Sequence, residues 1–216
     1  TKVGDPYRLY CAVLVRDVDG TYCNYVLFSD DFGLSWSILG DADVPPIPSG
    51  ADEPKTEELP DGSIVISSRC TGGRQYNIYT FTDSRRGEGN WGQAATSGAA
   101  TDGVVATSNS CNGEILIVPA RRRADGTEVY LALQSLPFGP GRANVGIYYK
   151  ELSSLTDFET PTLLAADWDG RHQATDLPSA YSTMTLQADH SIGFLYEEET
   201  HTTTAGGGYT IVYKNY

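Results

Sequence analysis

The sequence lacks the features that mark helical, membrane-spanning and nucleic-acid-binding proteins. No long segment of its 216 residues repeats apolar side chains every three to four positions, so we expect little helix. No apolar run is long enough to span a bilayer, and no signal peptide begins at Thr1. The 15 basic residues are outnumbered by 28 acidic ones, and the net charge of −13 argues against a nucleic-acid surface. Because this charge would repel an anionic substrate, arginines would have to form any anion site locally.

Cysteine motifs are absent as well. The sequence contains four cysteines: Cys11, Cys23, Cys70 and Cys111. They form no Cys-x-x-Cys pair, so zinc and thioredoxin-type sites are not indicated. A turn at 17–20 would set Cys11 opposite a residue near position 26 rather than opposite Cys23. We therefore expect buried free thiols, with a Cys11–Cys23 disulfide as the alternative. The three histidines are scattered in expected loops and form no metal or triad pattern: His172, His190 and His201.

The most informative segment that is present runs from Ser29 to Trp36, with the sequence SDDFGLSW. It fits the Ser/Thr-x-Asp-x-Gly-x-Ser/Thr-Trp pattern of the Asp-box, or BNR repeat, which closes the outer hairpin of a β-propeller blade. In such a turn Asp31 is expected to accept hydrogen bonds from backbone N–H groups. Gly33 supplies a backbone angle that other residues resist, and Trp36 is expected to bury its ring against the blade. The box performs no chemistry, but it predicts an architecture.

The remaining sequence predicts short strands joined by turns. Abundant tyrosine (14), with 23 glycines and 11 prolines, suits such a chain. Turn signals such as Pro-Asp-Gly at 60–62 and Ala-Asp-Gly at 124–126 separate the strands. The predicted strands are 7–16, 21–29, 34–39, 63–68, 75–82, one near 91, 114–119, 128–134, 144–151, a short piece near 161–165, 181–187, 191–197 and 209–216.

Two later segments look like eroded copies of the opening motif. The segment from Thr82 to Trp91 keeps the Asp and the Trp, and the segment from 148 to Phe158 replaces Trp by Phe. The aromatic landmarks Trp36, Trp91 and Phe158 are 55 and 67 residues apart, which suits one blade each. We therefore predict an all-β fold with about three to three and a half propeller blades, fewer than the four or more of a closed propeller. The alternative is an irregular β-sandwich with one accidental box.

Downstream of the box the chain resembles the sialidase (neuraminidase) superfamily, particularly bacterial sialidases of Bacteroidetes type. In that family a Glu, a Glu-Leu-x-(Asp/Asn)-Gly segment and a strand ending in Arg follow one another. Here Glu53, ELPDG at 58–62 and Arg69 stand in this order, and the Glu and the Arg are 16 positions apart. The resemblance implies that Glu53 is the catalytic glutamate and that Arg69 belongs to the arginine triad that binds the substrate carboxylate.

Two further segments are similar to the family in the same order. GRANVGIYY at 141–149 resembles the loop and strand with the next triad arginine, which implies Arg142. AYSTMTL at 180–186, followed by a strand ending at Glu197, is similar to the segment that presents the nucleophilic tyrosine. This implies Tyr181 as the nucleophile.

Several of these assignments have competitors in the sequence. Glu58 competes with Glu53, but it precedes a strand and is interpreted as structural. The arginine run at 121–123 competes with Arg142 and is interpreted as a solvated turn. Two interpretations of Glu197 remain open: an acidic residue at the surface, or a residue that orients a triad arginine. Two more residues are expected to line the glycerol or aglycone side of the pocket: Gln75 and Tyr76.

These residue types suit attack on a sialoside, whose carboxylate lies on the carbon that is attacked. A nucleophilic carboxylate would meet a like charge there, at a cost of about 4 kcal/mol at 4 Å with an effective dielectric near 20. A phenol avoids this repulsion, although its ordinary pKa of about 10 is too high for unaided attack at neutral pH. Glu53 would take the proton as Tyr181 attacks. Sialidases with a Tyr nucleophile are a known exception to the two-carboxylate rule of glycosidases.

The resemblance spans essentially all 216 residues but only the second part of a catalytic domain. The family's first triad arginine, in an Arg-Ile-Pro stretch, and its acid/base Asp have no counterpart, and Arg8 and Arg16 lack the local pattern. The absent initiating Met adds to the expectation of a processed or truncated product. The resemblance therefore implies that residues 1–216 are the C-terminal part of a sialidase catalytic β-propeller.

The implied function is that of an exo-α-sialidase, a retaining hydrolase that removes terminal sialic acid from glycoconjugates through a tyrosyl-enzyme intermediate. The alternatives are a trans-sialidase and a non-catalytic Asp-box propeller that binds carbohydrate. The expected partners are sialylated glycoproteins, glycolipids and oligosaccharides, together with the missing N-terminal part of the propeller. No nucleic acid, membrane span, cofactor or metal is expected. The resemblance implies a periplasmic, cell-surface or secreted protein.

Overall fold

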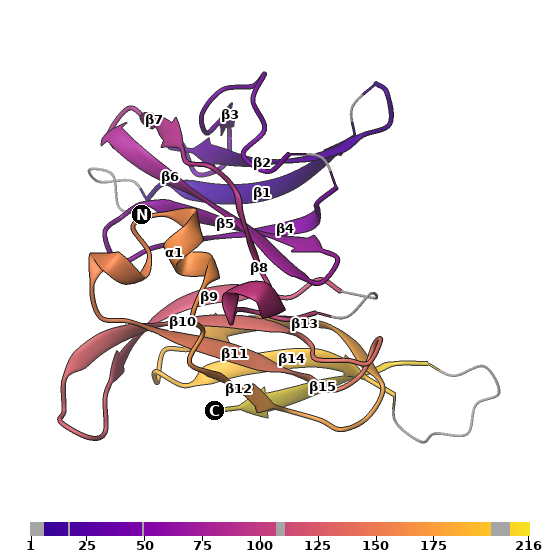
Figure 1. Cartoon of the computed structure of the whole chain (residues 1–216). Helices are drawn as coiled ribbons and strands as arrows, with labels where there is room; N and C mark the ends of the chain where they lie inside the picture. The colour runs from indigo at the N-terminus through magenta and orange to yellow at the C-terminus, as the bar shows by residue number, and fades with distance from the viewer. Residues whose placement is uncertain (1–6, 17, 49, 107–110, 200–207) are drawn as a thin grey trace.

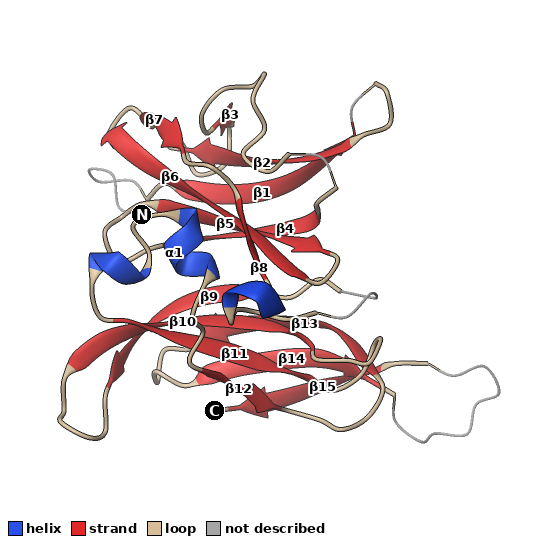
Figure 2. Cartoon of the chain, in the orientation of Figure 1, coloured by secondary structure: helices blue, strands red, loops and turns tan. Residues whose placement is uncertain are grey.

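The structure is a computed structural model that describes residues 7–16, 18–48, 50–106, 111–199 and 208–216. These residues fold almost entirely into antiparallel strands, arranged as four sheets in chain order (Figures 1 and 2). Among the described residues, none of the helices has the length and the apolar character needed to span a bilayer.

The four sheets are built from consecutive segments of the chain. The first contains β1 (Leu9–Arg16), β2 (Tyr22–Ser29) and β3 (Ser37–Ile38). The second contains β4 (Asp52–Glu58), β5 (Ile64–Cys70), β6 (Gly73–Asp83) and β7 (Glu88–Trp91), and β8 (Ala95–Ser97) pairs with β6. The third contains β9 (Ile115–Arg121), β10 (Glu128–Pro137), β11 (Val145–Leu152) and β12 (Gly170–Gln173), and the fourth contains β13 (Ser179–Leu186), β14 (Ile192–Glu198) and β15 (Thr210–Asn215).

Each pair of successive sheets encloses an apolar core. Ile64 and Ile66 of β5 pack toward the first sheet, while Val65 between them packs toward the third. On β10, Ala132 and Leu133 likewise face the second and the fourth sheet. Because successive strand residues point to opposite faces, a strand between two cores is apolar almost throughout. Full burial of each such side chain contributes roughly 1.5–3 kcal/mol.

This arrangement confirms the predicted fold class, an all-β chain that forms part of a β-propeller. Two sheets have the four or five strands of a complete blade and two have three, so the chain carries four blade-like sheets rather than a two-sheet sandwich. The sandwich alternative is therefore wrong. The strands on which the predicted site depends, β4, β5 and β13, belong to the second and fourth sheets, with the third sheet between them.

The turn between β2 and β3 has the local hydrogen bonds that the sequence predicts, but not the buried ring. Asp31 accepts from the N–H of Ser35 at 2.9 Å and from its hydroxyl at 2.6 Å, and Gly33 has a φ of +87°. Hydrogen bonds from Ser35 and then from Ser29 lower the pKa of Asp31 to about 2. Trp36 is 43% exposed and donates its indole N–H to the Gly33 carbonyl. The expected burial of Trp36 is wrong, since its ring lies against its own turn.

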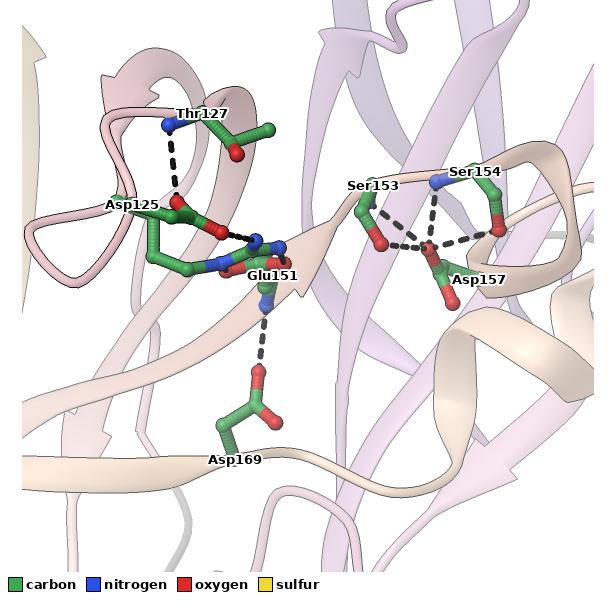
Figure 3. Close-up of polar contacts among 8 residues, drawn as sticks. Asp125, Thr127, Glu151, Ser153, Ser154, Asp157 and Asp169 are labelled. Atoms are coloured by element: carbon green, nitrogen blue, oxygen red, sulfur yellow. Dashed lines mark hydrogen bonds and ion pairs between the residues drawn. The ribbon is translucent and has the colours of Figure 1, made fainter.

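The two expected copies of this turn also contain an aspartate that accepts backbone N–H groups. Asp83 accepts from Arg85 at 3.0 Å, between β6 and β7. Asp157 accepts from Ser153 at 2.9 Å and from Ser154 at 2.8 Å (Figure 3). Phe158, next to it, is buried in the core between the second and third sheets. The three aspartates accept these N–H groups from different positions, four residues later for Asp31, two later for Asp83 and three to four earlier for Asp157, so the first turn is not repeated in detail.

The segment Pro161–Ala165 is a short helix, α1, and not the strand that we predicted. Thr160 precedes it, and its hydroxyl accepts a hydrogen bond from the N–H of Leu163. Pro161 at the first helical position has a φ that is already helical. Five residues are too few for the sequence period to separate a helix from a strand, but the Thr-Pro start favours the helix.

None of the four cysteines, all of which the structure describes, forms a disulfide, as expected. Cys11 lies opposite Leu27 in the β1–β2 register, so the predicted offset from Cys23 is confirmed. Cys70 and Cys111 are buried, but Cys11 is exposed. The expected burial is wrong for Cys11, because Tyr10 and not Cys11 faces the core against the second sheet.

Candidate active site

Glu53 lies in a β-bulge at the edge of the second sheet. Asp52 pairs with Arg69 and Lys55 pairs with Ser67, so two residues of β4, Glu53 and the proline after it, stand opposite one residue of β5. A proline fits such a position because it has no N–H to donate to the ladder. Glu53 has a φ of +38°, which is uncommon for a residue with a side chain. Backbone strain of this kind occurs preferentially at functional sites.

Tyr181 lies in a second bulge, at the edge of the fourth sheet. Ser179 pairs with Glu198 and Ser182 pairs with Tyr196, so two residues of β13 stand opposite Glu197 of β14. The Glu197 carboxylate accepts the backbone N–H of Tyr181 at 3.2 Å, which satisfies a donor in the irregular part of the ladder. The contact that the structure gives Glu197 is therefore with the backbone of the predicted nucleophile.

The side chains from the two bulges meet at one carboxylate. The Tyr181 hydroxyl donates to Glu53 Oε1 at 2.8 Å, and Arg69 Nη1 donates to Glu53 Oε2 at 2.7 Å. Arg69 Nη1 also lies 3.5 Å from the Tyr181 hydroxyl. The side chains of Arg69 and Glu53 are 22% and 27% exposed, so the group is accessible from solvent. The structure thus joins three predicted residues across 128 positions of sequence.

Arg142 reaches the same group from the loop between β10 and β11. Its carbonyl accepts the N–H of Ser179 at 2.9 Å, and an isolated bridge pairs Ala143 with Pro178. These contacts fix the loop to the start of β13. The guanidinium carbon of Arg142 lies 5.4 Å from the centroid of the Tyr181 ring, within the range of a cation–π contact.

The charges around Tyr181 act on its pKa in opposite directions. The hydrogen bond to Glu53, burial and the Glu53 charge raise the pKa of Tyr181, while Arg69 and Arg142 oppose the rise. Burial would lower the pKa of Arg69, but the hydrogen bond and the charge of Glu53 outweigh it, and the pKa of Arg69 is raised. At neutral pH the phenol therefore keeps its proton and directs it at the Glu53 carboxylate.

Three residues that the sequence analysis did not single out lie beside this group. Lys55 Nζ lies 3.3 Å from a carboxylate oxygen of Glu114, and the Thr183 hydroxyl donates to the same oxygen at 2.8 Å. Lys55 and Thr183 line a cavity of about 310 Å³ together with Tyr181. Each follows a predicted site residue by two positions, but the bulges at Glu53 and Tyr181 interrupt the two-residue period there, so strand alternation in the sequence could not have identified them.

The structure does not place Tyr76 at the wall of the pocket. Tyr76 is fully buried, its ring stacks on Trp168 at 6.2 Å, and its hydroxyl donates to Gln134 at 3.2 Å. Burial raises the pKa of the Tyr76 phenol. Gln75 lies opposite Ser68, and its Oε1 is buried without a hydrogen-bond partner in the described part of the chain. Because neighbouring strand residues face opposite sides, the expectation that both line one wall is wrong.

The competing arginines are engaged elsewhere. Arg122 forms ion pairs with Asp125 at 2.7 Å and with Glu151 at 2.5 Å, and Figure 3 labels these two acidic partners. Arg8 is buried, and its guanidinium donates to Asp30 at 2.7 Å. Within the described residues, the arginines in contact with Glu53 or Tyr181 are therefore Arg69 and Arg142.

The chain is similar in structure to several solved sialidases. The chain superposes on a Trypanosoma rangeli sialidase in complex with the inhibitor DANA, with a TM-score of 0.60 and 18% identity over 98% of this chain and 30% of that one. It matches the Hadza microbial sialidase Hz136 with a TM-score of 0.63 and 22% identity, over 88% of this chain and 33% of that one. It matches the NanB sialidase of Streptococcus pneumoniae with a TM-score of 0.62 and 26% identity, over 91% of this chain and 26% of that one. Other T. rangeli sialidase structures that it matches contain sialic acid, or 2,3-difluorosialic acid as a covalent intermediate.

No protein-family model and no curated protein matches the sequence. The chain spans about a third or less of the length of the sialidases that it matches. The structural likeness confirms the predicted resemblance at the level of the fold, which is that of part of a sialidase propeller.

Proposed function

We propose that this chain is the C-terminal part of the catalytic propeller of an exo-α-sialidase, which hydrolyses terminal sialic acid with retention through a tyrosyl-enzyme intermediate. One observation carries the proposal. The Tyr181 hydroxyl lies 2.8 Å from one oxygen of Glu53, and Arg69 binds the other oxygen at 2.7 Å. A nucleophile, its general base and a cation for an anionic substrate thus converge from two sheets.

In the first step the Tyr181 oxygen attacks the anomeric carbon of the sialoside. Its proton passes to Glu53 Oε1, which is already at the distance that general-base catalysis requires. The bond from the anomeric carbon to the aglycone oxygen breaks, and an acid protonates that oxygen. In the second step water attacks the anomeric carbon from the vacated face and gives one proton to the acid that was deprotonated in the first step, while Glu53 returns its proton to the tyrosine oxygen as the bond from that oxygen to the anomeric carbon breaks. Two inversions give net retention.

The substrate carboxylate is held by Arg69 and Arg142. A guanidinium offers two parallel N–H donors to a carboxylate, and it keeps its charge at any physiological pH. Since the protein carries a net charge of −13, such local positive charge is what would draw a sialoside to this point. By binding the carboxylate, the two arginines also hold the anomeric carbon near the phenol, in an orientation suited to attack.

The proposal assigns the acid that protonates the leaving group, and the third arginine, to the N-terminal part of the same propeller. This division agrees with the 26–33% of each matched sialidase that the chain covers. The T. rangeli sialidase structure described as a covalent intermediate with 2,3-difluorosialic acid supports the reaction class. The proposed substrates are sialylated glycoproteins, glycolipids and oligosaccharides, which places the protein in the periplasm, at the cell surface or outside the cell.

The test is hydrolysis of a fluorogenic sialoside by the complete propeller that contains this chain. Tyr181→Phe should lower kcat/KM by about 1,000-fold or more, as removal of a nucleophile does in other hydrolases. Tyr130→Phe, which removes a hydroxyl from an exposed tyrosine of β10, is the matched control. After incubation with 2,3-difluorosialic acid, mass spectrometry should find the adduct on the peptide that contains Tyr181.

Other outcomes would replace the proposal. Equal turnover by the unmodified protein and by Tyr181→Phe would show that Tyr181 is not the nucleophile. Sialic acid transfer to added lactose in place of release would make the protein a trans-sialidase. Binding of sialoside without turnover by the complete propeller would make it a carbohydrate-binding module.

A further inference from the structure

Two adjacent residues of β10, Gln134 and Ser135, join the three sheets around the site through buried hydrogen bonds. Both are fully buried and lie in the middle sheet. Their side chains reach opposite faces, so Gln134 contacts the second sheet, which carries Glu53, and Ser135 contacts the fourth, which carries Tyr181. We refer to Gln134 and Ser135 as the β10 clamp.

The Gln134 side of the clamp holds β5 beside the Glu53 bulge. Gln134 Oε1 accepts from the Ser67 hydroxyl at 2.7 Å, and Nε2 donates to the Glu114 carbonyl at 3.0 Å. Ser67 pairs with Lys55, the first regular pair after the bulge, and lies two positions before Arg69. The hydrogen bond therefore fixes the strand at the point where regular pairing resumes.

The Ser135 side holds β13 beside the Tyr181 bulge. Ser135 Oγ accepts from the Ser182 hydroxyl at 2.9 Å and from the Glu114 N–H at 2.9 Å. Ser182 follows Tyr181 directly, and it pairs with Tyr196 where the register resumes after the bulge. The arrangement on this side thus matches the arrangement on the Gln134 side.

A buried cation fixes the orientation of the Ser67 hydroxyl. Arg74 is fully buried, its Nε donates to Ser67 Oγ at 3.1 Å, and its Nη2 donates to the Ser67 carbonyl at 3.0 Å. Because Ser67 Oγ accepts from Arg74, its own proton is directed to Gln134 Oε1. A buried charge and a buried amide are costly unless they are hydrogen-bonded, so this network has little freedom to rearrange.

We infer that Gln134 and Ser135 are positioning residues, which set the distance between the Tyr181 hydroxyl and the Glu53 carboxylate. Strand pairing is interrupted at both bulges, so the ladders alone do not fix the two side chains relative to each other. The clamp bonds the nearest regular position on each side to one short segment of β10. Proton transfer at 2.8 Å needs this precision, since a displacement of about 1 Å is enough to slow an enzyme by about 100-fold. The catalytic meaning of this inference rests on the proposed function, but its structural content does not.

The structural content can be tested in the 216-residue chain without any turnover. The pKa of Tyr181 reports its contact with Glu53, because the hydrogen bond and charge of Glu53 raise it. The chain would be labelled with tyrosine carrying ¹³C at Cζ, and the Tyr181 signal identified from its loss in Tyr181→Phe and titrated by NMR. Ser182→Ala removes the hydroxyl that donates to Ser135, and Gln134→Met removes all the hydrogen bonds of the Gln134 amide at similar volume. Each should lower the pKa of Tyr181 toward the ordinary value of about 10.

Ser68→Ala is the matched control. Ser68 is fully buried, lies next to Ser67, and its hydroxyl has no hydrogen-bond partner within the described residues. It should leave the pKa of Tyr181 unchanged. A Tyr181 pKa that is the same in Ser182→Ala as in Ser68→Ala would overturn the inference, and this comparison stands even if Gln134→Met fails to fold.

In the complete propeller, Ser182→Ala should lower kcat by about 10- to 100-fold with little change in KM, because the arginines still hold the substrate. Unchanged kcat with a shifted Tyr181 pKa would contradict the positioning role. Full activity of Tyr181→Phe would instead refute the proposed function, and the pKa comparison would still decide whether the clamp sets the contact.

Discussion

The turn between β2 and β3 and the candidate site each depend on one carboxylate, but the partners of the two carboxylates lie at different distances along the chain. Asp31 is bonded to Ser29 and Ser35, at most four positions away. Glu53 is bonded to Arg69 and Tyr181, which are 16 and 128 positions away. The turn can form from its own eight residues, whereas the site exists only when the second and fourth sheets are held in place by the third. Because of this difference, the sequence alone predicts the hydrogen bonds of the turn more readily than the geometry of the site. For the same reason, mutations in the two regions are expected to have different effects.

The largest expected effect comes from removing the long-range carboxylate. Glu53→Gln keeps the shape of the side chain but removes its charge and its basicity. In the complete propeller it should lower kcat by about 100- to 10,000-fold, the usual contribution of a general base. In the 216-residue chain it should lower the pKa of Tyr181, because the Glu53 hydrogen bond and charge raise that pKa. Sialoside hydrolysis and the ¹³C titration measure the two effects.

Glu58→Gln is the control for that experiment, since Glu58 lies on the same strand and is the other glutamate that the sequence offered. It should leave kcat within about twofold, as exposed or strand-end substitutions away from a site usually do. If Glu58→Gln were the inactive variant and Glu53→Gln the active one, the long-range carboxylate would have been assigned to the wrong residue.

A smaller effect is expected from the backbone at Glu53. Its φ of +38° is tolerated far better by glycine than by alanine. Both Glu53→Ala and Glu53→Gly lose the contacts with Arg69 and Tyr181, so the difference between them isolates the backbone. Glu53→Gly should unfold at higher urea concentration, with a free energy of unfolding about 1 kcal/mol above that of Glu53→Ala. Equal stabilities would mean that the bulge stores no strain at this position.

The sequence predicted the local features and the family pattern. It did not predict the features that depend on packing between segments far apart in the chain. The hydrogen bonds of Asp31, the offset of Cys11 from Cys23 and the all-β fold follow from short-range patterns. The two bulges were not predicted, because a register shift depends on what packs against the strand and not on the strand alone. Neither was the β10 clamp, since nothing in the segment around Gln134 and Ser135 shows that both side chains are buried among polar partners.

One expectation conflicted with elementary geometry. Gln75 and Tyr76 are neighbours on one strand, so only one of them could face a given wall. Lys55 and Thr183 lie beside Tyr181, but the bulges interrupt the strand period between them and the predicted residues, so their position was not predictable from the sequence. The structure brings together the residues that the family pattern supplied, Glu53, Arg69 and Tyr181, and it buries Tyr76 away from the solvent.

The smallest effect is expected from the local carboxylate, and it concerns pH. The pKa of Asp31 is about 2 in the folded chain, because Ser35 and Ser29 donate to it, against about 3.9 for an aspartate in an unfolded chain. A lowered pKa contributes stability that is fully present above the unfolded value and is lost as the pH falls toward 2. Asp31→Asn should therefore lose less stability than the unmodified chain between pH 4 and pH 2, measured by urea unfolding at each pH. Glu128→Gln, at an exposed position on β10, controls for the removal of one acid. The same loss of stability in Asp31→Asn as in the unmodified chain would show that the turn does not depend on the charge of its aspartate.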